Sequence, residues 1–144
     1  GSTAVSATAI TFDDLIELYY SLREPYRKSA TLLLHESTVK AIRKLKDTQG
    51  QYIWQPSVSA DVPDKILNCP VVTSRYMPQM AADAKTVLFG GFSYYWIADR
   101  QGRTFKRLNE LYAFTGHVGF LGSQRVDAKI VLPEAIKTLK QASK

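Results

Sequence analysis

The first third of the chain carries apolar residues at helical spacing in two segments. In residues 11–22 they recur at intervals of three and four, which forms one apolar face: Phe12, Leu15, Ile16, Tyr19 and Leu22. The Thr11 hydroxyl is placed to accept a free backbone N–H at the start of this helix, and Pro25 ends it soon after. Ser37 is expected to cap a second helix, with apolar residues inward and cations mostly outward: Val39, Ile42 and Leu45 against Lys40, Arg43, Lys44 and Lys46.

The remaining apolar segments predict strands. Residues 30–35, between the two helices, form a nearly continuous apolar run, typical of a strand that is buried on both faces. Further strands are expected at residues 51–54, 66–73, 86–92, 103–108 and, with interruptions by glycine, 116–132. Phe89, Phe92 and Trp96 fall where core packing would place them, and Pro133 is expected to start a terminal helix. This order of elements is typical of an α+β protein.

Composition excludes several broad classes. Hydrophobic residues make up 45% of the 144 residues and charged residues 22%, so the chain is not disordered. No apolar run is long enough to span a bilayer, and the N-terminus lacks a secretory signal. The single cysteine, Cys69, excludes an internal disulfide and suits a reducing compartment.

The charge is basic and unevenly distributed. Nineteen Lys and Arg against thirteen Asp and Glu give a net charge of +6, which makes nucleic acid a candidate partner. Residues 2–22 hold only the acids Asp13, Asp14 and Glu17, whereas cations dominate residues 23–46. Because the second helix would carry its cations on a solvated face in any case, a basic nucleic-acid-binding module is an alternative function rather than the first one.

The residues that could support catalysis do not form a motif. Cys69, His35 and His117 are far apart in the sequence, and Cys69 lies in an expected strand, where a buried inert thiol is the ordinary state. A small hydrolase that pairs Cys69 with one of the histidines remains a second alternative. We expect no cofactor, no metal ion and no small-molecule substrate.

Short motifs follow one another in a fixed order from residue 68 onward. They occupy residues 68–78 (with Pro70, Val71 and Val72 before Met77 and Pro78), 87–100, 107–112, 116–120, 125–127 and 133–135. Together they resemble the major capsid proteins of tailed bacteriophages and prophages, whose fold is named after phage Hong Kong 97. The likeness covers most of the chain from about residue 9.

The resemblance implies a fold and a division of the chain. The fold is an α+β fragment of the Hong Kong 97 type, with a central mixed sheet flanked by helices (the axial domain) and strands of the peripheral domain. Residues 1–8 would be a flexible lead-in or tag, residues 9–99 and 129–144 the axial domain, and residues 100–128 the peripheral strands. The chain would be roughly the C-terminal half of such a protein, without the N-terminal arm, the extended loop and the spine helix.

The resemblance also implies a structural function. The protein would be a major capsid subunit and not an enzyme, assembled with copies of itself into an icosahedral head around non-specifically contacted DNA. It would reside in the virion after assembly in the cytoplasm of a bacterial host, without a membrane partner. A bacterial encapsulating compartment of the same fold is a related possibility. Expected contacts between subunits are made by Gln55, Asp61, Asp64, Lys65, Arg100, Arg103, Arg107, Glu110 and Arg125.

Overall fold

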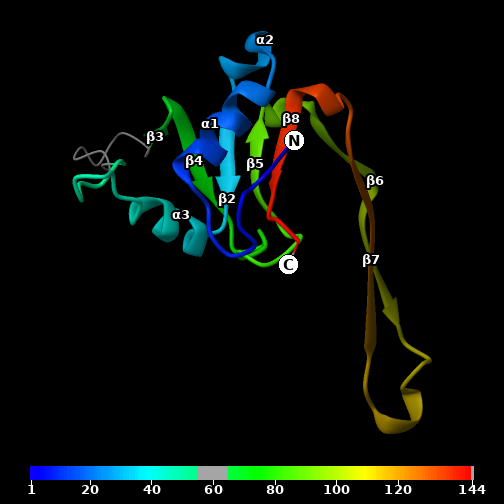
Figure 1. Cartoon of the computed structure of the whole chain (residues 1–144). Helices are drawn as coiled ribbons and strands as arrows, with labels where there is room; N and C mark the ends of the chain where they lie inside the picture. Colours follow the sequence, from blue (N-terminus) through cyan, green and yellow to red (C-terminus); the bar gives the residue numbers. More distant parts are fainter. Residues whose placement is uncertain (55–64, 144) are drawn as a thin grey trace. The chain divides into compact units, whose positions relative to one another are not determined.

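The structure is a computed structural model that describes residues 1–54 and 65–143 (Figure 1). It contains two compact units. One comprises residues 1–94 and 132–144 and is called here the sheet unit. The other comprises residues 95–131 and is called the hairpin unit. Among the described residues, no helix is long and apolar enough to cross a membrane.

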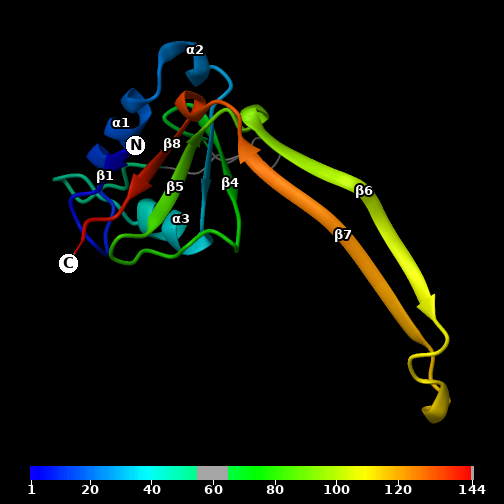
Figure 2. The same ribbon diagram turned by 90° about the vertical axis from the view of Figure 1, so that its right-hand side faces the viewer.

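The sheet unit is built on a six-stranded sheet in the order β1-β8-β5-β2-β4-β3. Its strands are β1 (Ser2–Thr3), β2 (Thr31–Leu34), β3 (Lys65–Ile66), β4 (Cys69–Thr73), β5 (Lys85–Gly90) and β8 (Ile136–Lys140). The β1–β8 and β2–β4 pairs are parallel, and the other pairs are antiparallel. The predicted mixed sheet is therefore confirmed, and Figure 2 shows β8 beside β5, with β4 further across the sheet.

Three helices accompany this sheet: α1 (Phe12–Ser21), α2 (Glu24–Arg27) and α3 (Glu36–Arg43). The predicted Thr11 cap is confirmed, because Asp14 N donates to Thr11 Oγ1 at 3.2 Å and Thr11 N donates to Asp14 Oδ2 at 2.8 Å. The two reciprocal bonds satisfy backbone groups at the helix start. The apolar face of α1 packs into one hydrophobic core with side chains from the strands and from α3. This core includes Leu15, Leu18, Leu32, Leu34, Ile42, Val87, Phe89 and Leu139.

Four local predictions about the sheet unit were wrong. The cap of α3 is His35, whose Nδ1 accepts from Ser37 N at 3.0 Å, and it lies two residues before the Ser37 cap that we expected. Pro133 starts only the 3₁₀ turn η3 (Pro133–Ala135). The residues after it form strand β8 instead of a helix, because their backbone groups pair with β5 and β1. Residues 51–54 form no strand but a single bridge between Tyr52 and Lys46.

The fourth concerns the expected flexible lead-in. Ser2 and Thr3 pair in parallel with Leu139 and Lys140, and Ala4 N continues the ladder by donating to Lys140 O at 2.7 Å. This part of residues 1–8 is therefore an edge strand of the sheet. The pattern of residues 1–9 did not indicate it, because a two-residue strand shows no period.

The hairpin unit consists of two long antiparallel strands, β6 (Tyr95–Leu108) and β7 (Gly119–Ile130), with the 3₁₀ turn η2 (Ala113–Thr115) between them. The predicted strands in this region are confirmed. The register shifts between Arg100 and Thr104, where Gly102 has a positive φ of 63°. Within the unit no third strand covers either side of the pair.

Candidate assembly surfaces

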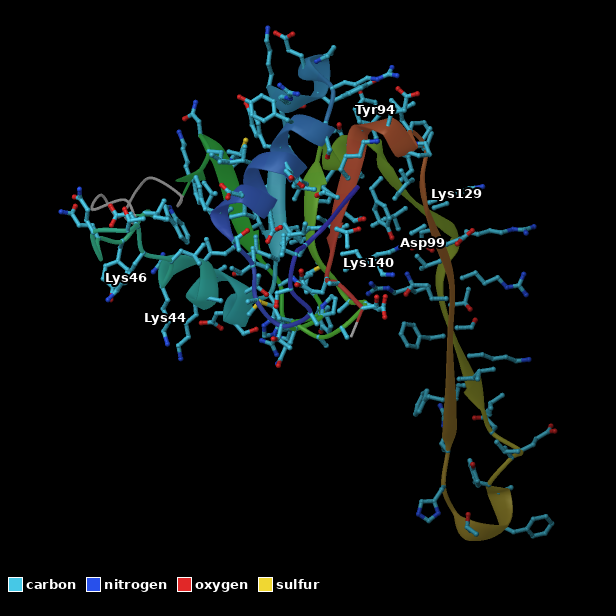
Figure 3. All side chains as sticks on the ribbon, in the orientation of Figure 1. Lys44, Lys46, Tyr94, Asp99, Lys129 and Lys140 are labelled. Atoms are coloured by element: carbon cyan, nitrogen blue, oxygen red, sulfur yellow. The ribbon has the colours of Figure 1, made fainter. Side chains whose placement is uncertain are left out.

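The hairpin presents two faces of different chemistry where residues 95–100 pair with residues 125–130. Cross-strand partners share a face, and successive residues alternate between the faces. The apolar face carries Tyr95, Ile97, Asp99, Val126, Ala128 and Ile130. The charged face carries Trp96, Ala98, Arg100, Arg125, Asp127 and Lys129. Figure 3 shows the Lys129 side chain extending from the hairpin into solvent.

Large apolar side chains of the hairpin unit are open to solvent. On the apolar face Ile97 is 67% exposed and Val126 is 53% exposed. On the charged face Trp96 is 66% exposed, so the prediction that Trp96 belongs to the core is wrong. A two-stranded hairpin alone is marginally stable in water, and a contiguous exposed apolar patch marks a surface that another molecule covers. The apolar face is therefore a candidate assembly surface.

Four of the predicted contact residues in the hairpin unit lie on its two strands, and Glu110 lies between the strands. Arg100 and Arg125 lie directly opposite each other, and like charges in that position are unfavourable unless an acidic group approaches them. Arg103 is held within the hairpin, since its Nε donates to Gln124 Oε1 at 3.2 Å. Arg107 lies opposite Phe120, and Glu110 follows β6 in the connection to β7.

Of the other predicted contact residues, the structure describes only Lys65. Lys65 begins edge strand β3, with its side chain exposed, and its carbonyl accepts a hydrogen bond from Trp54 Nε1 at 2.9 Å. Gln55, Asp61 and Asp64 lie outside the described residues. The structure thus brings Arg100 and Arg125 together, whereas reasoning from charge missed the apolar face. The signal was present in the alternation of apolar and charged residues at 126–130, opposite the continuous apolar run at 95–98.

Comparison with known proteins identifies the family. The model of the phage capsid family matches residues 1–141. The chain belongs to this family. No curated protein matches it significantly.

Solved capsids have the same fold as this capsid-family chain. It is 32% identical to the chain described as the capsid of a native GTA particle, with a TM-score of 0.84, and covers 98% of its own length but 48% of that chain. The capsid of an empty GTA particle gives 32% identity, a TM-score of 0.83, and coverage of 98% and 49%. A Gordonia phage Cozz chain shares the fold at 14% identity and a TM-score of 0.70, with coverage of 100% and 50%. The predicted α+β capsid fold is confirmed, and the chain spans about half the length of these capsid chains.

The structure does not support the alternative of a Cys–His hydrolase in this capsid-family chain. His35 is level with Ser74 in the parallel β2–β4 register, and Ser74 lies five residues beyond Cys69, about 16 Å along the strand. No hydrogen bond in residues 1–54 and 65–143 joins Cys69 to His35 or His117. In the same residues, no three His, Cys, Asp or Glu side chains are grouped so as to hold a metal ion.

We expect Cys69 to behave as a buried, inert thiol. Its side chain is 5% exposed, and desolvation by burial raises the pKa of the Cys69 thiol. At pH 8 a thiol reagent should label the native chain at least about 100-fold more slowly than the chain in denaturant, measured by absorbance. The pKa of the Cys69 thiol is higher in the folded chain than in the unfolded chain. The stability linked to its protonation is therefore fully present below the unfolded pKa and is lost as the pH rises through the folded pKa. Equal labelling rates would show an exposed thiol.

Proposed function

We propose that the chain forms part of a major capsid subunit, copies of which assemble into the icosahedral head of a phage or prophage. The observation that carries the proposal is the match of the phage capsid family over residues 1–141. The likeness to GTA capsid chains at 32% identity supports it. Such a subunit works by contact with other copies and requires no catalytic step, so we propose that it is not an enzyme.

The division of the chain follows from the same proposal. We assign residues 9–99 and 129–144 to the axial domain and residues 100–128 to the peripheral strands. The presence of a sheet unit and a separate hairpin unit supports an assignment to two domains. The net charge of +6 favours non-specific contact with packaged DNA. The proposed location is the virion, which is assembled in the cytoplasm of the bacterial host.

Contacts between subunits would combine the apolar face of the hairpin with charged residues of the same unit. Burial of apolar side chains supplies most of the attraction in such a contact, whereas an exposed ion pair contributes between about 0 and 1 kcal/mol. Arg100, Arg107, Glu110 and Arg125 would therefore adjust orientation more than affinity. Small contributions of this kind allow a misplaced subunit to leave and the shell to correct itself.

The proposal predicts that the 144-residue chain associates through the apolar face of its hairpin. Size exclusion across a concentration series should show an oligomer that grows with concentration. Ile97→Gln combined with Val126→Gln should shift the profile toward the monomer, because both substitutions lie on the apolar face. Arg125→Gln combined with Lys129→Gln, on the charged face, is the matched control and should leave most of the association intact.

Electron microscopy of the same samples separates association from shell formation. We expect small oligomers and no closed shells, because this chain spans only about half the length of the capsid chains that it resembles. A strictly monomeric profile at every concentration would count against the proposal. Closed particles of native size would show that the 144-residue chain is sufficient for a shell.

A further inference from the structure

In the sheet unit, α1 carries exposed acids and α3 carries exposed lysines, together with exposed Glu36 in its first turn. On α1, Asp13 and Glu17 are exposed and four residues apart, so they project from the same side of the helix. On α3, Lys40 and Lys44 are likewise exposed and four residues apart. We call these pairs the α1 acids and the α3 lysines. Figure 3 shows Lys44 extending from the end of α3 away from the sheet.

These four side chains have no partner within the part of the chain that the structure describes. The ion pairs found there join Arg23 to Glu134 at 3.0 Å and Lys140 to Asp83 at 2.6 Å. The neighbouring cations are occupied differently: Arg43 lies over the Trp54 ring at 5.0 Å and Lys46 over the Tyr52 ring at 5.0 Å. The α3 lysines are therefore the cations of this helix that remain available to another molecule.

The α1 acids and the α3 lysines belong to different surfaces of the sheet unit. Helix α1 packs against β1 and β8, and its buried side chains also reach Ile66 of β3. The α3 lysines line an open groove of about 730 Å³ together with Glu36 of the same helix and Thr73 of β4. A contact between unlike surfaces is heterologous, and repeating it generates a ring when the rotation closes.

We propose that the α3 groove binds the α1 acids of a second copy of this chain, head to tail. The inference rests on the proposed function and names the surfaces that join neighbours. The spacing fits, because four residues of helix rise about 6 Å on both sides and two ion pairs form at once. Exposed ion pairs are weak singly, so the contact is reversible and sensitive to salt.

Zero-length cross-linking tests the pairing directly. Chains with natural and ¹⁵N isotope content are mixed in equal amounts at high concentration and low salt, and a carbodiimide then joins amines to carboxylates that touch. We expect mixed-isotope peptides that join Lys40 or Lys44 to Asp13 or Glu17, and their loss at 0.5 M NaCl. Absence of such peptides, or links confined to a single chain, would overturn the inference.

Charge reversal provides the second test. Lys40→Glu with Lys44→Glu, and separately Asp13→Lys with Glu17→Lys, should each weaken these cross-links about tenfold, because two attractions become repulsions. An equimolar mixture of the two variants should restore links between positions 40 or 44 and positions 13 or 17. Recovery on mixing excludes misfolding as the cause of the loss. Lys28→Glu with Lys85→Glu changes the net charge equally at exposed sites and is the matched control.

Three outcomes would contradict the inference. If the control variant loses the cross-links equally, the effect is due to net charge alone. If the mixture of the two charge-reversed variants does not recover the cross-links, the α1 acids and the α3 lysines do not pair. The third outcome is that Lys40→Glu with Lys44→Glu lowers the affinity for a double-stranded DNA probe while cross-links at other sites are unchanged. This would make α3 a DNA-binding surface. In that case association through the apolar face of the hairpin would still support the proposed function, so the two failures are distinguishable.

Discussion

Replacing Gly90 by alanine is expected to unfold the sheet unit or to destabilise it by about 4 kcal/mol or more. Gly90 ends β5 with φ of 155°, a backbone conformation that residues with a side chain rarely adopt. An added Cβ would overlap the carbonyl oxygen of Ala135 and lie 2.7 Å from Ile136 Cα. Both obstacles are backbone atoms where η3 meets β8, so neither can turn aside as a side chain would.

The adjacent glycine supplies the control. At Gly91 an added Cβ would meet Ser29 Oγ at 3.6 Å and the Tyr94 ring at 3.6 Å, which are ordinary contacts. Gly91→Ala should therefore change the free energy of unfolding by no more than about 1 kcal/mol. Urea unfolding followed by circular dichroism measures both variants. If Gly90→Ala has the same midpoint as Gly91→Ala, the close approach of β5 and β8 is not rigid.

The parts of the fold that local signals determine were predictable from the sequence. Thr11, Asp14 and the apolar positions of α1 act within a few residues of one another, and the helix and its cap follow from them. Strands β2 and β5 also carry enough apolar residues to be recognised alone. By contrast, β8 has buried Ile136 and Leu139 three residues apart, a spacing that also fits a helix. Pairing with β5 and β1 makes this segment a strand, and such distant partners leave no local pattern.

The candidate assembly surfaces were predictable only in part. The cations of the hairpin were visible in the sequence, but Arg100 faces Arg125 because of a register that shifts before Thr104. A sequence without strand pairing does not specify that register. Trp96 was assigned to the core because it is large and apolar, yet within the hairpin unit no layer covers it. The family resemblance supplied what the residues alone did not, namely a reason for apolar strands to remain exposed until assembly.

Phe89→Ala should be the most destabilising substitution in the interior of the sheet unit. The Phe89 side chain is 1% exposed and lies against the Tyr19 ring, with centroids 5.7 Å apart. Leu15, Leu18, Leu32 and Ile66 complete the surrounding wall. Truncation of a buried phenylalanine removes its transfer free energy and leaves a cavity, which together cost about 3–5 kcal/mol.

That cost is a large share of the stability of a domain of this size, so the melting temperature should fall by roughly 15 °C. Leu88→Ala is the matched control, because Leu88 precedes Phe89 on β5 but is only partly buried on the opposite face of the sheet. Thermal unfolding by circular dichroism compares the two variants. Equal shifts would mean that α1 does not seal the sheet on the Phe89 side. A large shift for Phe89→Ala alone would show that the core lies between α1 and the strands. The opposite face of β5, which carries Leu88, would then contribute little to stability.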